Sequence, residues 1–330
     1  MSEQQPILNV EALATEFRTE RGVVKAVNNV SFVLRRGETL GIVGESGSGK
    51  SVTNLSILRL IEFPPGRITG GRVLYDGEDV LSLTESEVRA IRGKEISMIF
   101  QDPLTSLNPV IKVWKQIAEP LMIHQGMKKK EAKAEAIRLL KLIGIPDAEL
   151  RAESYPHHFS GGMRQRVMIA MALSCNPDIL IADEPTTALD VTIQAQILDL
   201  IREKRAERQT SVIMITHDLG VVAEMCDRVC VMYAGQIVER ADVDALFSDP
   251  LHPYTRGLLD SIPRLDRTGQ ERLHTIGGAP PDLLDLPSGC PFRPRCAKAM
   301  EICATDMPPE ITIGTGRTVA CHLYREKMYE

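Results

Sequence analysis

The sequence of 330 residues lacks any long hydrophobic run. Its longest apolar stretches, Ile179–Ala182 and Val212–Ile215, are only as long as a strand. A helix that crosses a bilayer needs about 20 predominantly apolar residues. We therefore expect no membrane-spanning helix, so that any work at a membrane has to be done through partner proteins.

An export signal and an excess of positive charge are also missing. The start, Met-Ser-Glu-Gln-Gln-Pro, has neither the basic residues nor the apolar core of a secretory signal, so we expect a protein of the reducing cytoplasm. The net charge of −5 gives no support to a general nucleic-acid binder. The short run Lys128–Lys130 lies in a segment with helical periodicity and is interpreted as a solvated helix face.

Closely spaced cysteine pairs are absent from the C-terminal segment, although it holds four of the seven cysteines. Structural zinc sites usually use C-x₂₋₄-C pairs, and disulfides are disfavoured in the cytosol. Four thiolates in a loop-rich segment favour an iron–sulfur cluster, with zinc or unligated thiols as alternatives. The cluster candidates, separated by five, six and seventeen residues, are Cys290, Cys296, Cys303 and Cys321. The other three lie in apolar segments and are predicted to be buried: Cys175, Cys226 and Cys230.

Strand-like and helix-like segments alternate along the first 245 residues. A β-rich stretch over 8–39 is followed by the buried-strand pattern of Thr39–Val43, a glycine-rich turn and an apolar helix from about Lys50. A helical period over 110–151 indicates an inserted helical subdomain. Further strands are expected at 72–75, 96–100, 179–182 and 212–216, a hairpin at 228–238, and helices at 163–174 and 192–208. This alternation predicts an α/β fold around a parallel sheet.

The composition changes near residue 246. Prolines crowd the remaining sequence, and little hydrophobic periodicity is left. We therefore predict two parts, a domain over 1–245 and a small loop-rich, cysteine-containing appendage over 246–330.

One motif in the first part carries nucleotide chemistry. It matches G-x-x-x-x-G-K-[ST] between a predicted strand and a predicted helix, as a phosphate-binding loop requires. Glycines let successive N–H groups turn inward around phosphate oxygens, and the helix adds its positive N-terminal end. Lys50 is expected to reach the β- and γ-phosphates, and Ser51 to ligate Mg²⁺. The ATP-binding residues of this loop are Gly44, Glu45, Ser46, Gly47, Ser48, Gly49, Lys50 and Ser51.

Two carboxylates follow a second buried strand, Ile179–Ala182. Asp183 is positioned to act on Mg²⁺ as in other phosphate-loop hydrolases. Glu184 is then placed to orient and polarise the attacking water. An N-capping role for these carboxylates before Pro185 is the alternative.

The segment Phe159-Ser160-Gly161-Gly162-Met163-Arg164-Gln165 resembles the signature motif of ATP-binding-cassette proteins, with Phe159 and Met163 in place of the commoner residues of L-S-G-G-Q. Gln101 resembles the Q-loop glutamine of that family, Ala188-Leu189-Asp190 its D-loop, and His217 its switch histidine. The resemblance implies a phosphate-loop NTPase fold: a RecA-like parallel core, an antiparallel β subdomain and a helical subdomain over about 102–165.

The resemblance also implies how the site works. Two cassettes sandwich two nucleotides, because Ser160, Gly161 and Gly162 of one chain face the γ-phosphate held by another. Closure assembles Glu184, His217 and Gln101 around that phosphate. In addition, Gln101 joins Ser51 and Asp183 as a Mg²⁺ ligand, Asp190 contributes to the ATP site, and Phe17 stacks on the adenine.

Longer stretches resemble the ATPases of oligopeptide and dipeptide importers, a peptide/nickel uptake family. They are residues 101–109, 182–192, Met232-Tyr233-Ala234-Gly235 and His252-Pro253-Tyr254-Thr255. The resemblance implies peptide uptake at the cytoplasmic face of the membrane, two permease subunits, a second ATPase that is more often a paralogue than an identical copy, and an extracytoplasmic solute-binding protein. It also implies a [4Fe–4S] cluster on the four tail cysteines. Nickel or glutathione import, or a soluble cassette regulator, are alternatives.

Overall fold

The computed structural model describes residues 6–186, 189–261 and 276–328. They fall into two compact units. The first is built mainly from Ser82–Ile215 with Leu34–Thr39, and the second from Leu8–Val33, Leu40–Leu81 and Thr216–Glu330. The start that we interpret as lacking an export signal, and Ala188 of the predicted D-loop, lie outside the described residues.

Three parallel strands form the centre of the first unit: β6 (Ile96–Ile99), β7 (Ile179–Asp183) and β8 (Ser211–Ile215), with β7 in the middle. Every residue of the three is buried. Such continuous apolar runs are typical of parallel strands covered on both faces. Because parallel strands end at the same edge of a sheet, Asp183 lies in register with Ile215 where β7 and β8 end.

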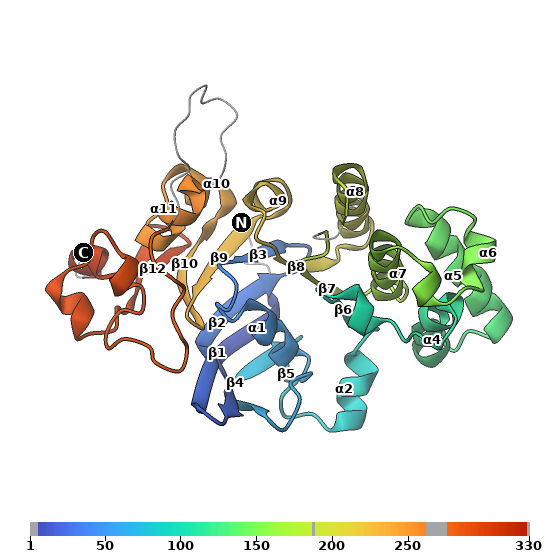
Figure 1. Cartoon of the computed structure of the whole chain (residues 1–330), viewed down its shortest axis with the longest axis horizontal. Coiled ribbons are helices and arrows are strands. Elements are labelled where there is room, and N and C mark those ends of the chain that lie inside the picture. Colours follow the sequence, from blue (N-terminus) through green and yellow to red (C-terminus); the bar gives the residue numbers. More distant parts are fainter. Residues whose placement is uncertain (1–5, 187–188, 262–275, 329–330) are drawn as a thin grey trace. The chain divides into compact units, whose positions relative to one another are not determined.

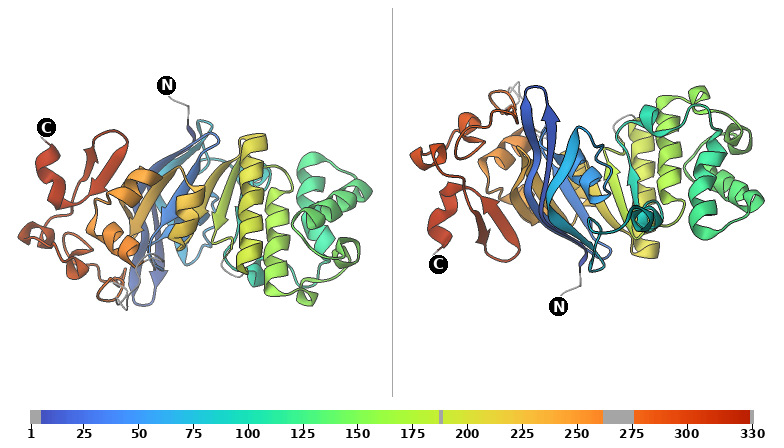
Figure 2. Two further views of the ribbon diagram at one scale, coloured as in Figure 1. Left: turned by 90° about the horizontal axis from the view of Figure 1, so that it is seen from above. Right: turned by 90° about the horizontal axis from the view of Figure 1, so that it is seen from below.

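The helices of the first unit are α2 (Glu85–Ile91), α3 (Pro103–Ser106), α4 (Val113–Gln125), α5 (Lys129–Leu142), α6 (Ala148–Ala152), the 3₁₀ turn η1 (Pro156–His158), α7 (Gly161–Leu173) and α8 (Val191–Arg208). Helices α7 and α8 lie side by side (Figure 2). Helices α4, α5 and α6 gather on the other side of α7 (Figure 1). The helical period over 110–151 is thus confirmed. Buried residues at helical spacing hold α4 against α5, among them Ile117, Leu121, Ala136 and Leu140.

The second unit contains an antiparallel sheet in the order β2-β1-β4-β5. Its strands are β1 (Pro6–Thr19), β2 (Gly22–Arg35), β4 (Gly66–Tyr75) and β5 (Glu78–Asp79). Alternate residues are buried along β2, including Val30 and Phe32, as expected for a sheet with one covered face.

A second group of strands in this unit runs β3-β9-β10-β12-β11. Strands β3 (Thr39–Val43) and β9 (Arg228–Tyr233) are parallel, and β10 (Gln236–Asp242), β12 (Arg317–Ala320) and β11 (Glu310–Ile313) continue antiparallel. The C-terminal segment therefore adds two strands to the edge at β10 (Figure 1). The remaining elements are α1 (Lys50–Ile57), α9 (Leu219–Met225), α10 (Val243–Ser248), α11 (Pro253–Asp260) and the 3₁₀ turns η2 (Arg293–Arg295), η3 (Glu301–Ala304) and η4 (His322–Met328).

The predicted α/β class is confirmed by this arrangement of parallel strands and helices. In the described part of the chain, no helix is both long enough and apolar enough to span a bilayer.

Candidate functional site

The predicted phosphate loop connects β3 to α1 in the second unit. Lys50, the first residue of α1, is 7% exposed, and its ammonium group turns back over the loop. It donates to the carbonyl oxygens of Gly44 at 2.7 Å and Glu45 at 2.8 Å. A positive charge and the N-terminal end of a helix thus lie together at the concave loop, an arrangement suited to polyphosphate.

Two glycines are required by the loop's close packing. Gly44 has φ +151° and Gly49 has φ +103°, conformations that residues with a Cβ rarely adopt. A Cβ on Gly44 would lie 2.3 Å from the Met232 carbonyl oxygen, and one on Gly49 would lie 2.4 Å from that of Ala26. The loop is therefore seated directly on the backbone of β9 and β2, and no larger residue fits at either position.

Glu45 connects the loop to the C-terminal segment. Its backbone N–H donates to the Tyr254 hydroxyl at 2.7 Å. Its carboxylate accepts two hydrogen bonds from the Arg295 guanidinium, at 2.6 and 2.8 Å. Sequence reasoning missed this contact. The only signal in the sequence was that Tyr254 lies in the stretch His252-Pro253-Tyr254-Thr255, which resembles a known family, and nothing in the sequence pointed to Arg295.

The predicted carboxylates lie at the end of β7 in the first unit. Asp183 is 3% exposed, and Glu184 is half-buried with φ +49°. The N–H of Glu184 donates to the carbonyl of Ile215 on β8 at 2.9 Å. A non-glycine residue with positive φ costs free energy, and it persists only where its surroundings hold it. The hydrogen bond to Ile215 thus helps to fix the backbone turn that carries Glu184.

The predicted signature residues begin α7 in the same unit. Ser160 is the N-cap, and its hydroxyl accepts a hydrogen bond from the N–H of Met163. Ser160 and Gly161 are exposed, and a Cβ on Gly161 would meet nothing within 4 Å. The N-terminal end of α7 is therefore accessible, and the residue after its cap, Gly161, has no side chain in the way. Such an end suits the binding of an anion.

Buried Gln165 of α7 contacts the turn that carries the carboxylates. Its side-chain amide donates to the Pro185 carbonyl at 2.9 Å, directly after Glu184. The signature helix and the carboxylate turn are thus one connected structure within the first unit. The signature motif includes Gln165 but does not by itself indicate this contact.

The other predicted site residues lie in both units. In the first unit, Gln101 is exposed just after β6, and Asp190 caps α8 by accepting from the N–H of Ile193 at 3.0 Å. In the second, His217 is exposed shortly before α9. Phe17 is half-buried in β1, opposite Gly66 of β4. Their roles toward a nucleotide stay predictions.

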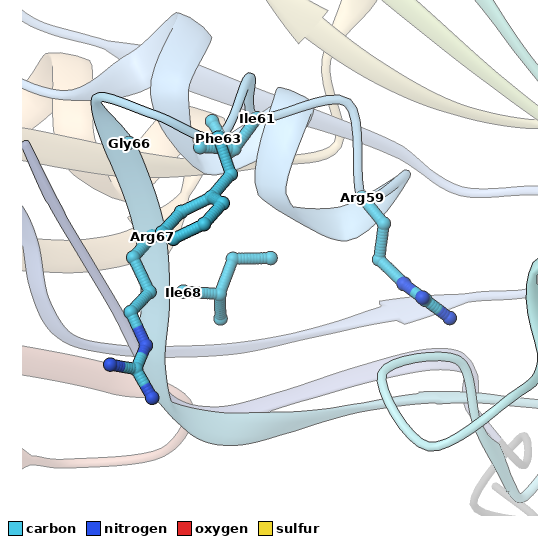
Figure 3. A pocket seen from close by; sticks show the side chains of 6 residues that line it. All are labelled: Arg59, Ile61, Phe63, Gly66, Arg67 and Ile68. Atoms are coloured by element: carbon cyan, nitrogen blue, oxygen red, sulfur yellow. The ribbon is translucent and has the colours of Figure 1, made fainter.

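An open pocket of about 580 Å³ lies beyond the C-terminal end of α1. In Figure 3 the side chains of Arg59 and Arg67 border it on opposite sides, with Phe63 and Ile68 between them. The Phe17 ring packs beside it, because a Cβ on Gly66 would lie 2.7 Å from that ring. The phosphate loop is at the opposite end of α1, so this pocket is not part of the phosphate site.

The prediction of a [4Fe–4S] cluster is wrong. Among the residues that the structure describes, no group of three or more His, Cys, Asp or Glu side chains is arranged to hold a metal ion. The four predicted ligands, Cys290, Cys296, Cys303 and Cys321, do line one common cavity. Its volume of about 10 Å³ admits roughly one water molecule, which is far too little for a four-iron cluster.

Burial opposes ionisation of three of the tail thiols, because it raises the pKa values of Cys290, Cys296 and Cys321. Burial, together with a smaller effect of the neighbouring thiols of Cys290, Cys296 and Cys303, raises the pKa of the Cys321 thiol to about 11. Since a thiolate is the form that ligates metals, these shifts oppose the charge state that a cluster needs. The prediction for Cys175, Cys226 and Cys230 is confirmed, because all three are buried.

His252 gives this region a pH dependence that can be tested. Burial lowers the pKa of its imidazole to about 3 from 6.5. Between these values the unfolded chain binds more protons, so the stability present above about pH 6.5 is lost as the pH falls toward 3. We expect the contribution of His252 to the free energy of unfolding to drop by about 2 kcal/mol from about pH 7 to about pH 5.

The matched variant is His252→Asn, whose side-chain oxygen can still cap α11 as the Nδ1 atom of His252 does for the N–H of Tyr254. Urea unfolding at the two pH values should show a shallower fall in stability for His252→Asn than for the unchanged chain. Exposed His157→Asn serves as the control. Equal falls in the unchanged chain and His252→Asn would refute this account of His252.

Comparison with known protein families gives two matches along the chain. Residues 27–187 match the family described as "ABC transporter". Residues 238–303 match "Oligopeptide/dipeptide transporter, C-terminal region". The first match contains the phosphate loop, the signature helix and the carboxylates, and the second contains Arg295 and three of the four tail cysteines.

Several curated proteins are similar over nearly the whole chain. The oligopeptide transport ATP-binding protein AppD of Bacillus subtilis is 53% identical over 97% of this chain and 98% of its own length. The oligopeptide transport ATP-binding protein OppD of Salmonella typhimurium is 55% identical over 96% and 93%. The dipeptide transport ATP-binding protein DppD of Bacillus subtilis is 52% identical over 98% and 96%.

Among solved structures, the chain resembles the ATP-binding cassette MJ0796, described as a dimer in a post-hydrolysis state bound to ADP and phosphate. The TM-score is 0.66 and the identity 28%, over 72% of this chain and 98% of that one. The structure of cbiO1 of Clostridium perfringens, described as part of the ABC transporter complex cbiONQ, gives a TM-score of 0.60 at 27% identity, over 74% of this chain and 92% of that one. Both likenesses agree with the phosphate-loop fold predicted from the motifs.

Proposed function

Because the chain belongs to the ATP-binding subunits of ABC transporters and is therefore an ATPase, we propose that its ATP hydrolysis powers the uptake of short peptides. The observation that carries the proposal is the likeness over nearly the full length to proteins named for oligopeptide and dipeptide transport. The match of residues 238–303 to the C-terminal region of such transporters adds support. These relatives are named for peptides, which favours peptides over nickel or glutathione as cargo.

ATP is held by the phosphate loop through its N–H groups, the N-terminal end of α1 and the Lys50 ammonium. The Ser51 hydroxyl, the Asp183 carboxylate and the Gln101 side-chain oxygen are the predicted ligands of Mg²⁺. All three are hard oxygen donors, the type that this ion prefers. When bound, Mg²⁺ neutralises charge that develops on the β- and γ-phosphates.

Hydrolysis requires a base for the attacking water, and Glu184 has this role in our proposal. This role is supported by the position of Glu184 directly after β7, where the hydrogen bond from its N–H to the Ile215 carbonyl and its left-handed backbone conformation define the turn. His217 and Gln101 then assemble around the γ-phosphate together with Glu184. These roles follow the family motifs that the two residues match.

Two chains act together in this proposal. The exposed N-terminal end of α7, with Ser160, Gly161 and Gly162, meets the γ-phosphate held by the partner chain, and Asp190 lies near the same junction. The dimeric state of the similar cassette MJ0796 supports this arrangement. Phe17 stacks on the adenine of the nucleotide in its own chain.

Permease subunits couple this dimer to the membrane. We propose that two permease subunits are present and that the chain is bound peripherally at their cytoplasmic face. The second cassette is a paralogous ATPase, and an extracytoplasmic protein delivers the peptide. A soluble regulator is the competing function, and it would need no permease.

Reconstitution tests the proposal. The chain would be purified together with candidate permeases and a candidate second ATPase from the same organism, and placed in liposomes with the candidate binding protein. We expect a mixture of short peptides to stimulate ATP hydrolysis and to accumulate in the lumen, whereas nickel and glutathione should have no effect. Failure of the chain to associate with any permease would overturn the transport function, while stimulation by nickel alone would overturn only the cargo.

A further inference from the structure

The ion pair between Arg295 and Glu45 differs from the surface pairs of this protein. The side chain of Arg295 is 5% exposed and that of Glu45 is 24% exposed, and the two groups meet through two hydrogen bonds. The remaining Nε donor of Arg295 bonds to the carbonyl of Gly277 at 2.9 Å. A bidentate pair that is largely removed from water specifies geometry in a way that an exposed pair does not.

All polar groups of Glu45 are engaged. Its carboxylate accepts from Arg295, its N–H donates to Tyr254, and its carbonyl accepts from the Lys50 ammonium at 2.8 Å. The peptide group of Glu45 therefore lies between the C-terminal segment on one side and the phosphate-binding lysine on the other. A change in the orientation of Glu45 must change the position available to the Lys50 ammonium.

An aromatic cluster makes the C-terminal side of this connection stiff. The Tyr254 ring is fully buried and meets the rings of Tyr233 at 4.7 Å and Phe292 at 5.4 Å between centroids. The Tyr233 and Phe292 rings meet at 5.2 Å, and the Arg295 guanidinium lies over the Tyr233 ring. Closely packed rings transmit displacement because the protein interior is nearly incompressible.

The same cluster belongs to the part of the chain that holds the four tail cysteines, Cys290–Cys321, which we call the cysteine-lined segment. Phe292 and Arg295 stand between Cys290 and Cys296, and Phe292 also lines the cavity of the four thiols. The N–H of Cys290 donates to the carbonyl of Cys303 at 2.9 Å, which closes this segment into one compact loop. The position of Arg295 is therefore set by the packing around the thiols.

We propose that Arg295 is a positioning residue for ATP binding: through Glu45 it holds the phosphate loop in the shape that presents Lys50, so that nucleotide affinity depends on the folded cysteine-lined segment. The residue does not touch the nucleotide. It acts on the loop through the Glu45 carboxylate, and a second contact, from the Glu45 N–H to the Tyr254 hydroxyl, reinforces it.

Nucleotide titration of the full-length chain tests this. Arg295→Met keeps the length of the side chain but removes its charge, and Glu45→Gln removes the partner charge. We expect each variant to raise the dissociation constant of MgADP about tenfold, which is a typical value for a charge-assisted pair. In the reconstituted transporter the KM for ATP should rise similarly, with kcat at saturating ATP within about twofold of the unchanged value.

The double variant separates positioning from unrelated damage. If both residues act through one contact, Arg295→Met with Glu45→Gln should also show a roughly tenfold effect, whereas independent effects would multiply to about 100-fold. The matched control is Arg21→Ala. This variant breaks the exposed ion pair between Arg21, in the β1–β2 turn, and Asp282, in the C-terminal part of the chain, and neither residue contacts the phosphate loop in this pair. Arg21→Ala should therefore leave the dissociation constant of MgADP unchanged.

Reciprocity provides a second readout. If the segment supports nucleotide binding, MgADP must in turn stabilise the segment. We expect MgADP to slow alkylation of Cys296 in the unchanged chain but not in Arg295→Met.

Should Arg295→Met fail to fold, Glu45→Gln can be used for both measurements, because its substitution lies outside the cysteine-lined segment. Unchanged affinity in folded Glu45→Gln, multiplying effects in the double variant, or a loss in kcat alone would each overturn the proposal.

Discussion

Replacing Glu184 with glutamine is expected to lower the rate of ATP hydrolysis at least about 100-fold, the usual range for loss of a general base. Glutamine has nearly the same size and its side-chain oxygen can still accept hydrogen bonds, but it cannot take the proton of the attacking water. The backbone of the turn should persist, because the hydrogen bond from the N–H of residue 184 to Ile215 does not involve the side chain. ATP should therefore bind normally and remain uncleaved.

Phosphate release by the transporter measures this rate, and retention of radiolabelled ATP on the purified protein measures the trapped state. Glu203→Gln provides the control, because Glu203 is an exposed carboxylate on α8 of the same unit. Hydrolysis at the unchanged rate by Glu184→Gln would show that another group takes the proton. Loss of ATP binding would show instead that Glu184 supports the turn rather than the chemistry.

The phosphate loop could be predicted from the sequence because its chemistry is local. Eight consecutive residues supply the glycines, the lysine and the hydroxyl, and the strand before them and the helix after them have clear hydrophobic periods. The carboxylates after β7 were predictable for the same reason, since a short apolar strand ends directly in Asp183 and Glu184. In both places the proposed site residues are neighbours in the chain.

The C-terminal segment shows where such reasoning ends. Its pairing of β12 with β10 brings together residues about 80 positions apart, and strands of four residues leave almost no periodic signal. The contact of Arg295 with Glu45 spans 250 positions. Neither could be found from local patterns, because a long-range contact depends on the packing of everything between its partners.

The cysteine spacing misled for a related reason. Four cysteines within 32 residues suggested ligands for a common group, and the side chains do meet at one cavity. Spacing reports only what a chain can reach, whereas a metal group also needs open space and ionised thiols. Packing by Phe292 and the raised pKa of Cys321 provide the opposite conditions.

Replacing Lys50 with alanine is expected to weaken ATP binding about 100-fold, which corresponds to about 2.7 kcal/mol. One charge-assisted hydrogen bond contributes about 1.5–3 kcal/mol, so losing the bond to the phosphates accounts for the effect. The largely buried ammonium already lies over the loop, where it donates to Gly44 and Glu45. Binding therefore exchanges these carbonyl partners for phosphate oxygens without a large movement of the side chain.

Lys50→Arg separates charge from shape. The planar guanidinium is wider than an ammonium group, and the loop leaves room for a compact donor close to two carbonyl oxygens. We therefore expect Lys50→Arg to remain at least about tenfold weaker than the unchanged chain although its charge is retained. Calorimetric titration with MgADP measures both variants, and Lys129→Ala, on the exposed face of α5, is the control for loss of a lysine. Full recovery of affinity in Lys50→Arg would show that the loop requires a positive charge there and not the compact geometry of lysine.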